Sequence, residues 1–384
     1  MKIVVFGGDG FCGWPTSLHL SDLGHDIHIV DNLSRRKIDC DLGVNSLTPI
    51  RSIFDRISCW NELTGKNITF SNLDVANSFE KVLDIFTELS PDAIVHFAEQ
   101  RAAPYSMKSA ATKNYTVNNN ISATHNILNA ICLVKPDCHV VHLGTMGVYG
   151  YGTAGIDIPE GYLEVNVAGS TENQTTEILY PTNPGSIYHL TKSMDQLLFA
   201  FYAKNNNLRI TDLHQGIVWG VETKQTLKDE RLINRFDYDG DYGTVLNRFL
   251  MQAAIGYPLT VHGSGGQTRA FIHISDTVKC IELAVSSPPK EGERVKIMNQ
   301  MTETHTVKSL AELVSSKTGA EISYLKNPRK EADENELNVN NASLISLGLN
   351  PTLLSDVLAD EILDTVKKYA DRCNTSLIPC NSKW

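Results

Sequence analysis

The feature that most constrains this chain is a glycine-rich turn near its N-terminus, Gly7-Gly8-Asp9-Gly10-Phe11-Cys12-Gly13, which directly follows an apolar run. Glycine in such a turn lets the chain pass tightly from a strand into a helix, and lets backbone N–H groups approach a pyrophosphate at the helix N-terminus. A glycine pattern alone is not specific, because ordinary strand–helix turns also use glycine. Here the next apolar run ends at Asp31, where a carboxylate binds the adenosine ribose hydroxyls and repels a 2′-phosphate. The pattern therefore predicts a dinucleotide site that prefers NAD to NADP.

Short apolar runs alternate with amphipathic stretches over the first two-thirds of the chain, which indicates βαβ units and a parallel sheet. Strands are expected at 2–7, 26–31, 68–73, 93–98, 139–144 and 209–214, and helices at 12–24, 78–89, 118–134 and 187–205. Segment 222–243 reads as a long loop. Helical patterns follow at 244–255, 275–287, 306–318 and 355–371, with short strands at 259–262, 269–274 and 294–299.

The predicted fold class is therefore α/β, a Rossmann-type doubly wound parallel sheet with a smaller C-terminal substrate-binding lobe. We place the nucleotide-binding domain at 1–216, with some later strands crossing back to it, and the lobe at 217–384.

Composition narrows the class of protein. The formal net charge of -10 argues against nonspecific nucleic-acid binding. No apolar run is long enough to span a membrane. The eight cysteines lack zinc spacing, so we expect free thiols and no metal site. Met1 leads straight into the first strand, which leaves no room for a signal peptide and suggests a cytoplasmic protein.

A second motif carries chemistry. Tyr188 and Lys192 are four residues apart in a predicted helix, so both side chains can face one pocket. A nearby cation favours the ionised phenol and is expected to lower the pKa of Tyr188 toward neutrality. Thr145 ends the fifth predicted strand, at the ligand-binding edge of such a sheet. The three residues predict proton removal from an alcohol whose hydride passes to a nicotinamide.

Further cofactor contacts follow from the strand ends. Asp74-Val75 follows the third strand, near adenine, and Phe97-Ala98-Glu99 follows the fourth, near the pyrophosphate and nicotinamide ribose. Arg35 and Arg36 argue for NADP, because guanidinium groups bind phosphate, but the motif fixes Asp31 more firmly. The full expected NAD-binding set is Gly7, Asp9, Gly10, Phe11, Cys12, Gly13, Asp31, Asn32, Leu33, Arg36, Asp74, Val75, Phe97, Ala98, Glu99, Asn119, Tyr188, Lys192, Gln215 and Val218.

Together Thr145, Tyr188 and Lys192 resemble the catalytic set of the extended short-chain dehydrogenase/reductase superfamily. The sugar-nucleotide 4,6-dehydratases of that superfamily carry Thr-Asp-Glu at this strand end, and their carboxyl groups move the protons of the elimination. This chain has Met146 and Gly147 instead. Neither side chain can transfer a proton, which counts against an ordinary dehydratase.

A more specific resemblance is to the UDP-sulfoquinovose synthase family. It rests on the runs Glu99-Gln100-Arg101-Ala102-Ala103-Pro104-Tyr105-Ser106-Met107, Gly144-Thr145-Met146-Gly147, Tyr188-His189-Leu190-Thr191-Lys192, Gly265-Gly266-Gln267-Thr268-Arg269 and Asn327-Pro328-Arg329. The resemblance implies that UDP-glucose and sulfite are converted to UDP-6-sulfoquinovose. The implied steps are C4 oxidation by retained NAD, water loss to a 4-keto-5,6-ene, sulfite addition at C6 and C4 re-reduction.

The resemblance also implies the remaining site residues. We group His189 and Met146 with Thr145, Tyr188 and Lys192, with His189 for proton transfer or sulfite binding. Arg101 is expected to hold sulfite or sugar, or else to pair with Glu99. The expected substrate-binding set is Arg101, Thr145, Gln215, Arg248, Thr260, His262, Gln267, Arg269, Arg329 and Glu331, with the lobe arginines for diphosphate.

Two other functions remain open at this point. A UDP-glucose 4-epimerase would use the same oxidation without elimination or sulfite. A noncatalytic NAD-binding regulator would have no need of a proton-transfer set. By analogy with the superfamily, we expect a homodimer that pairs the helices at 118–134 and 187–205.

Overall fold

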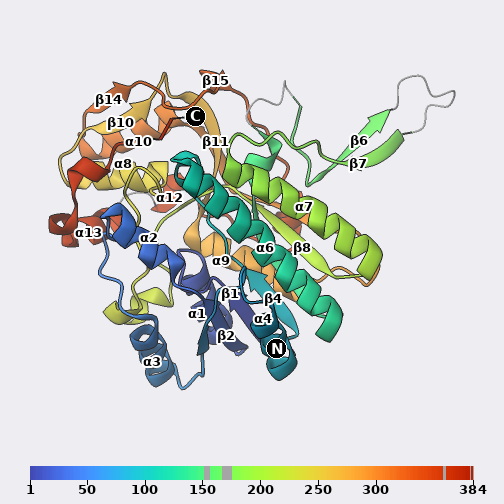
Figure 1. Ribbon diagram of the computed structural model, residues 1–384. Coiled ribbons are helices and arrows are strands. Elements are labelled where there is room, and N and C mark those ends of the chain that lie inside the picture. Colours follow the sequence, from blue (N-terminus) through green and yellow to red (C-terminus); the bar gives the residue numbers. More distant parts are fainter. Residues whose placement is uncertain (151–155, 167–174, 358–359, 381, 384) are drawn as a thin grey trace.

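A parallel seven-stranded sheet forms the centre of the computed structural model, which describes residues 1–150, 156–166, 175–357, 360–380 and 382–383 (Figure 1). The strand order is β12-β8-β5-β4-β1-β2-β3. The strands are β1 (Lys2–Phe6), β2 (Asp26–Asp31), β3 (Thr69–Asn72), β4 (Ala93–His96), β5 (His139–Thr145), β8 (Ile210–Gln215) and β12 (Lys296–Gln300). The order reverses between β1 and β4, as in a doubly wound fold, so the predicted α/β class is confirmed.

Helices cover both faces of this sheet, because successive residues of its strands point to opposite sides. Ile3 and Val5 of β1 belong to a core that packs against α1 (Gly13–Asp22), α3 (Ile53–Thr64) and α9 (Ile274–Ser286). Val4 and Phe6 belong to the opposite core, against α4 (Phe79–Leu89), α6 (Ala110–Val134) and α7 (Ile187–Asn206). At the centre of the sheet, where both faces are buried, β1 and β4 read as nearly continuous apolar runs.

A smaller lobe with its own apolar core, which includes Trp219, Phe236, Phe249 and Phe271, stands at the carboxyl ends of the strands. In it β10 (Leu259–His262) pairs with β14 (Ile322–Leu325), and β11 (Gly266–His273) pairs with β9 (Ile217–Trp219), β13 (Glu303–Thr306) and β15 (Glu334–Asn335). The lobe's helices are α8 (Val245–Ala254), α10 (Val307–Thr318), α12 (Leu354–Val357) and α13 (Asp360–Lys368). A hairpin of β6 (Tyr162–Asn166) and β7 (Thr175–Leu179) projects from the body (Figure 1).

Some elements differ from the sequence expectations. Helix α6 begins eight residues before the expected 118, where Ser109 and Thr112 form a reciprocal capping box. The expected helix 355–371 is divided into α12, α13 and the 3-10 turn Ala370–Arg372. The helices α2 (Ser34–Leu42), α3, α5 (Ala103–Met107) and α11 (Ala342–Ser346) were not expected.

Two observations bear on the division into domains. Strand β12 and helix α9, both after residue 217, pack with the main sheet rather than with the lobe. The boundary at 216/217 therefore remains a proposal, and it marks where most of the chain passes from the sheet domain to the lobe.

No helix among the described residues has the length and apolar character to cross a bilayer.

Candidate functional site

A cavity of about 380 Å³ lies between the carboxyl ends of the sheet strands and the lobe. Its wall contains almost every residue expected to bind cofactor or substrate, although these come from positions 7 to 331. The exceptions are Leu33, Arg36 and Asp74. The sequence motifs thus converge on one place, as they must if they act on one substrate.

The glycine turn is built for close backbone approach. Gly7 has φ +84, which favours glycine. A Cβ at Gly13 would lie 2.1 Å from the carbonyl oxygen of Gly7, so any side chain there would force the turn open. The turn opens directly into α1, whose N-terminus faces the cavity through Phe11 and Cys12. This cradle fits the pyrophosphate of a dinucleotide.

Asp31 lies at the tip of β2, as expected. Its carboxylate accepts hydrogen bonds from the backbone N–H groups of Asp9 (2.9 Å) and Leu33 (2.7 Å). Burial and the neighbouring Asp9 carboxylate raise the pKa of Asp31 to about 6. A carboxylate fixed in this way suits ribose hydroxyls and opposes a 2′-phosphate.

The two arginines that argued for NADP have carboxylate partners. Arg36 donates from Nε to Asp9 at 2.6 Å, and Arg35 pairs with Asp39 and stacks on the Tyr242 ring at 3.6 Å. Their charges are therefore already compensated, which leaves Asp31 to decide the preference. Arg36 and Leu33 lie outside the cavity wall. Arg36 contacts the glycine turn through Asp9. Leu33 is the residue before α2 and has a left-handed φ of 56°.

The third residue outside the wall, Asp74, closes a turn after β3. Its Oδ1 accepts from the backbone N–H of Ala76 at 3.1 Å, and Val75 beside it lines the cavity in its place. A turn carboxylate of this kind is a common local motif, and sequence spacing does not distinguish it from an adenine contact.

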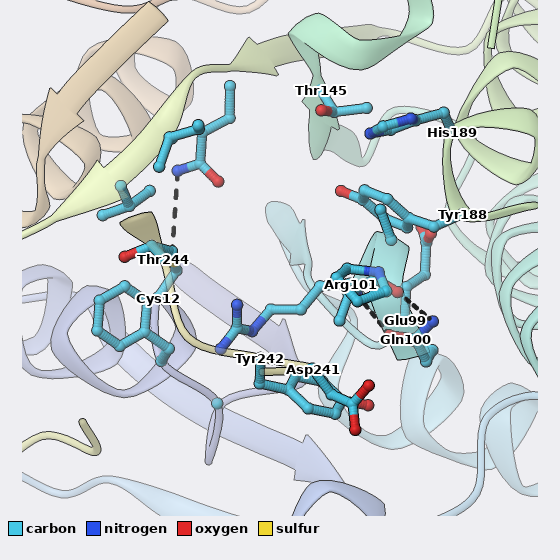
Figure 2. Close-up of a pocket in the computed structure, with 18 of the residues that line it drawn as sticks. Cys12, Glu99, Gln100, Arg101, Thr145, Tyr188, His189, Asp241, Tyr242 and Thr244 are labelled. Atoms are coloured by element: carbon cyan, nitrogen blue, oxygen red, sulfur yellow. Dashed lines mark hydrogen bonds between the residues drawn. The ribbon is translucent and has the colours of Figure 1, made fainter. Parts of the chain in front are cut away.

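The expected catalytic set is assembled by β5 and α7. Thr145 ends β5, and α7 begins one residue after Ser186, whose hydroxyl caps the helix by accepting from the backbone N–H of His189 at 3.2 Å. Tyr188 and Lys192 then line the cavity together with Thr145, whose hydroxyl accepts from the backbone N–H of Gly147 at 3.1 Å. Figure 2 shows Thr145, Tyr188 and His189 along one side of the cavity.

The expected pKa of Tyr188 is wrong. Burial raises the pKa to about 12, although Lys192 and Thr145 act in the expected direction. Lys192 is itself buried, yet Glu99 and Tyr188 raise its pKa above the usual value, so it is an ammonium ion. Its Nζ donates to Glu99 Oε2 (2.9 Å) and to the carbonyl of Leu143 (2.7 Å).

Glu99 and Arg101 separate in space although they are close in sequence. The Glu99 side chain is 2% exposed and lies beneath Lys192. Arg101 pairs instead with Asp237 at 2.5 Å, so the expected alternative pairing with Glu99 is wrong. Arg101 remains 34% exposed and lines the cavity near Tyr242 (Figure 2). Part of its guanidinium group is therefore available to an anion.

His189 packs against the residue that replaces the dehydratase carboxylate. A Cβ at Gly147 would lie 2.3 Å from Cδ2 of the His189 ring, so only glycine leaves this ring its position. Burial, with Arg329 and Arg269, lowers the pKa of His189 to about 3. The ring is therefore neutral at pH 7. A histidine beside Tyr188 is expected from the sequence to titrate near neutrality, and that expectation is wrong. Met146 is buried and packs in an apolar cluster with Leu337.

The lobe contributes a polar wall. Arg248 and Gln267 are buried, and their Nε and Nε2 atoms have no hydrogen-bond partner within the described part of the chain. Buried donors of this kind suit a phosphate and a uracil or ribose oxygen. Burial, with Arg248 and Arg329, also lowers the pKa of His262 to about 4.

Other expected substrate residues have protein partners. Glu331 accepts from Arg269 at 2.5 Å, and the Thr260 hydroxyl accepts from Gln252 at 2.7 Å. Glu331 therefore positions Arg269 within the wall as well as lining the cavity.

Sequence reasoning missed one part of the wall, the segment 240–245 together with Cys380. The segment follows Asp237, which holds Arg101, and its Tyr242 stacks on Arg35. The dense run Asp237-Tyr238-Asp239-Gly240-Asp241-Tyr242-Gly243 was a usable signal, because buried Asp and Tyr in a loop need polar partners.

Comparisons with known proteins agree with this geometry. The model of the "NAD dependent epimerase/dehydratase family" matches residues 3–299. The chain is 47% identical to the UDP-sulfoquinovose synthase, chloroplastic, of Spinacia oleracea, over 100% of this chain and 79% of that protein. It is 41% identical to the UDP-sulfoquinovose synthase of Sulfolobus acidocaldarius, over 91% and 88% of the two chains.

Solved structures share the fold at low identity. The UDP-glucose 4-epimerase of Thermotoga maritima with UDP-glucose superposes with a TM-score of 0.70 at 20% identity, over 97% of this chain and 99% of that chain. The UDP-glucose-4-epimerase of Stenotrophomonas maltophila, with bound NAD and formylated UDP-arabinopyranose, gives 0.72 at 20% identity, over 97% and 100%. At this identity the likeness concerns the fold alone.

Proposed function

This chain belongs to the NAD dependent epimerase/dehydratase family and, within it, to the UDP-sulfoquinovose synthases, and we propose that it converts UDP-glucose and sulfite to UDP-6-sulfoquinovose. The proposal rests on one observation: the three residues that oxidise an alcohol are all present, but the acid/base carboxylates of a dehydratase are absent beside them. Thr145, Tyr188 and Lys192 line the cavity, and the dehydratase carboxylate position is Gly147, filled by the His189 ring. This arrangement supports a route that shares the first step of a dehydratase and then departs from it.

NAD is the cofactor, and the glycine turn and Asp31 fit it. Bound NAD would supply the acceptor for the hydride from C4 of the sugar and the donor that later reduces the C4 ketone. Tyr188 accepts the proton of the C4 hydroxyl, and Thr145 shares that proton through its hydroxyl. Lys192, fixed as an ammonium ion by Glu99, stabilises the phenolate that this step requires.

The elimination needs a proton acceptor at C5. A ketone at C4 acidifies the C5 hydrogen. The proton removed from C5 is passed on to the departing C6 hydroxyl, which leaves as water. We assign this proton transfer to His189, whose neutral ring has a lone pair at pH 7. Burial lowers its pKa most, and Arg329 and Arg269 lower it further. These are two of the cations proposed to bind the diphosphate, so substrate binding should neutralise them and make His189 more basic.

Sulfite, entering as bisulfite, then adds through sulfur at C6 of the conjugated ene, and its proton is taken up by the C5 carbanion that the addition creates. Arg101 offers a partly exposed guanidinium group for this anion, with Asp237 fixing its other edge. Tyr188 finally returns its proton to the C4 oxygen as the ketone is reduced. No net oxidation occurs, so the same dinucleotide serves successive turnovers.

The sulfite dependence of turnover tests this proposal. UDP-glucose should be consumed to completion only when sulfite is present, as followed by anion-exchange chromatography of the nucleotide sugars. A 4-epimerase would instead yield UDP-galactose with or without sulfite. A noncatalytic regulator would leave UDP-glucose unchanged in both cases.

The purified protein should contain NAD, and NADP should bind poorly, because the Asp31 carboxylate meets the 2′ position and Arg35 and Arg36 are already paired. Chromatography of the nucleotide released by acid measures this. NADP as the main nucleotide would contradict the assignment and return Arg36 to phosphate binding.

The expected homodimer is a further proposal, supported by an apolar stripe on α7. Leu190, Met194, Leu197 and Phe201 are exposed at helical spacing on one face of α7, which packs beside α6. A second copy of this chain could cover the stripe about a two-fold axis, since the same face would meet itself. The stripe carries no charge that would oppose such pairing.

Leu197→Glu should convert the dimer to a monomer, because two carboxylates would face each other across the axis. Sedimentation velocity would show the change in mass. Phe54→Glu is the matched control: Phe54 is 65% exposed, as is Leu197, but lies on α3. A monomeric native protein, or equal dissociation by both variants, would refute this interface.

The cytoplasmic location expected from the sequence stays a proposal, because the spinach relative is named as chloroplastic.

A further inference from the structure

Lys192 contacts a buried network of polar side chains whose members lie outside the Tyr188–Lys192 motif. His142 on β5 has no exposed side-chain surface. Its Nε2 lies 2.9 Å from Lys192 Nζ, and its Nδ1 lies 2.8 Å from Asp212 Oδ1 on β8. The imidazole therefore connects the ammonium group of the catalytic set to a carboxylate on the neighbouring strand.

The network continues beyond Asp212. Its Oδ2 lies 3.0 Å from Nε2 of His214, whose Nδ1 is 2.6 Å from the Tyr149 hydroxyl. The Tyr149 hydroxyl in turn donates to Asn299 Oδ1 at 2.9 Å. Asp212 is thus fixed on both sides, and it holds the His142 ring in one orientation.

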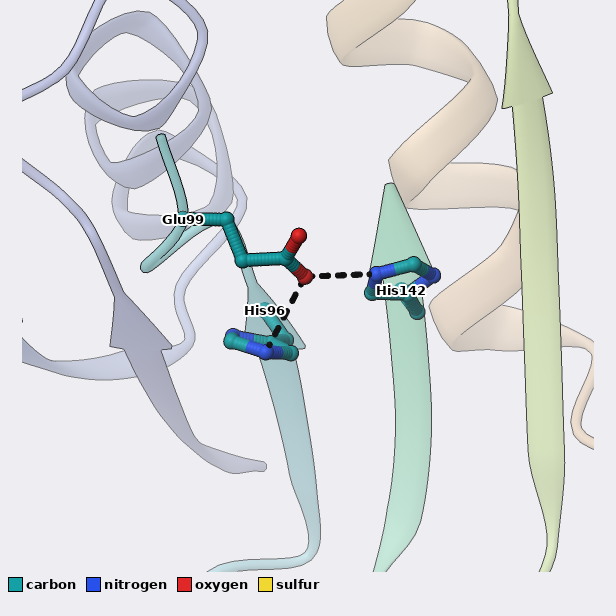
Figure 3. A group of neighbouring side chains, drawn as sticks. All are labelled: His96, Glu99 and His142. Atoms are coloured by element: carbon teal, nitrogen blue, oxygen red, sulfur yellow. Dashed lines mark hydrogen bonds and ion pairs between the residues drawn. The ribbon is translucent and has the colours of Figure 1, made fainter. Parts of the chain in front are cut away.

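His142 and two of its neighbours resemble a metal site. His96, Glu99 and His142 offer ligand atoms within 4.8 Å of one another (Figure 3). Lys192 already donates to Glu99 and contacts the same Nε2 of His142. A metal ion there would face an ammonium group that shares its ligands, so the arrangement suits proton exchange better than metal binding.

The geometry around His142 Nε2 allows two proton arrangements. Nε2 is 2.9 Å from Lys192 Nζ and 3.0 Å from Glu99 Oε1, and it cannot accept from one while it donates to the other. In the first arrangement a neutral ring accepts a proton from the Lys192 ammonium. In the second, the proton has moved to Nε2, the imidazolium donates to Glu99 and Asp212, and Lys192 is a neutral amine. One proton moves and the total charge is unchanged.

The surrounding groups keep both arrangements accessible. Glu99 and Tyr188 raise the pKa of Lys192 despite its burial, so the ammonium form is the resting arrangement. Burial and Lys192 lower the pKa of His142, but Asp212 and Glu99 outweigh them and raise it above its usual value. From α7, Asp195 Oδ2 lies 3.8 Å from the ring, and burial with Glu99 raises its pKa well above normal, so this carboxyl keeps its proton. From β4, burial lowers the pKa of His96 to about 3, so that ring is neutral.

We propose that His142, held by Asp212, is a positioning residue that takes one proton from Lys192 and returns it during C4 oxidation and re-reduction. With that proton on His142, the neutral Lys192 amine can accept the Tyr188 hydroxyl proton. The resulting phenolate can then take the proton of the substrate's C4 hydroxyl. The proposal rests on the proposed function only for its first step, the oxidation at C4.

The test is the pH dependence of bound-NAD reduction by UDP-glucose without sulfite, followed by NADH absorbance. His142→Gln keeps a polar group but cannot carry the proton. We expect its midpoint to move to higher pH by about one unit or more, with UDP-glucose affinity nearly unchanged. His96→Gln is the matched control, because His96 contacts Glu99 but not Lys192, and should keep the native profile. Asp212→Asn, which leaves the ring in place, should shift the profile in the same direction and serves if His142→Gln does not fold.

A native profile in either His142→Gln or Asp212→Asn would overturn the proposal, as would an equal shift in His96→Gln. Nitrogen NMR of ¹⁵N-histidine-labelled, NAD-bound protein provides a readout without turnover. The His142 signal should show exchange between imidazole and imidazolium that Lys192→Met abolishes, and a ring fixed in one state would refute the exchange. If the native protein reduces no NAD with UDP-glucose, the proposed function fails, and the NMR result still decides the role of His142.

Discussion

Tyr188→Phe should lower turnover by about 10²–10⁴-fold, the range for loss of a positioned acid or base. The phenyl ring fills the same buried space beside Thr145, so NAD and UDP-glucose should still bind with near-native affinity. Stopped-flow NADH absorbance and isothermal calorimetry separate the two effects. The loss should appear already in NAD reduction, because Tyr188 acts in the first chemical step.

Two outcomes would contradict this role. A variant with native turnover would show that another group accepts the C4 proton. A variant that loses NAD or UDP-glucose binding in proportion to its activity would make Tyr188 a binding residue. Thr145→Val provides a milder comparison, since it removes only the hydroxyl that shares the proton.

His189→Ala should separate the first step from the second. C4 oxidation should continue, because Tyr188 and Lys192 remain in place, and NADH should accumulate on the protein. Sulfonated product should fall by about 10²-fold or more. Exchange of the C5 hydrogen with deuterated water, followed by NMR of UDP-glucose, should slow by a similar factor.

Gly147→Ala gives an independent approach to the same ring. Its Cβ would lie 2.3 Å from His189 Cδ2, so the ring must move while its chemistry is retained. We expect the same accumulation of NADH with little product. Native-like C5 exchange with lost product would assign His189 to sulfite handling or water departure instead. Native-like product yield in His189→Ala would remove it from the mechanism.

The strands of the sheet could be predicted because the signals that mark them, an apolar run followed by a turn residue, lie close together in the sequence. In β1 the run Ile3-Val4-Val5-Phe6 is apolar at successive positions, as is typical of a strand buried on both faces, and glycine marks the turn that follows. Helix α2 was missed because its sequence, Ser34-Arg35-Arg36-Lys37-Ile38-Asp39, shows little apolar periodicity. Contacts such as Arg36 with Asp9 hold it in place, and these are visible only after folding.

The site could be predicted as a list of residues but not as a set of contacts. Motif spacing placed Tyr188 and Lys192 on one face, since four residues make about one helical turn. Asp237, which holds Arg101 from 136 residues away, has no such local signal. The pKa predictions for Tyr188 and His189 failed for a related reason. The first considered the Lys192 charge and the second the ordinary pKa of histidine, whereas burial dominates both shifts.

Incubation of the purified protein with UDP-glucose and isotopically labelled sulfite, followed by mass spectrometry of the nucleotide sugars, tests the central claim most directly. We predict a UDP-sugar that carries the labelled sulfonate, with its carbon–sulfur bond at C6, formed without added NAD in amounts exceeding the enzyme. UDP-galactose without label would identify a 4-epimerase, and unchanged UDP-glucose would contradict catalysis of this kind altogether.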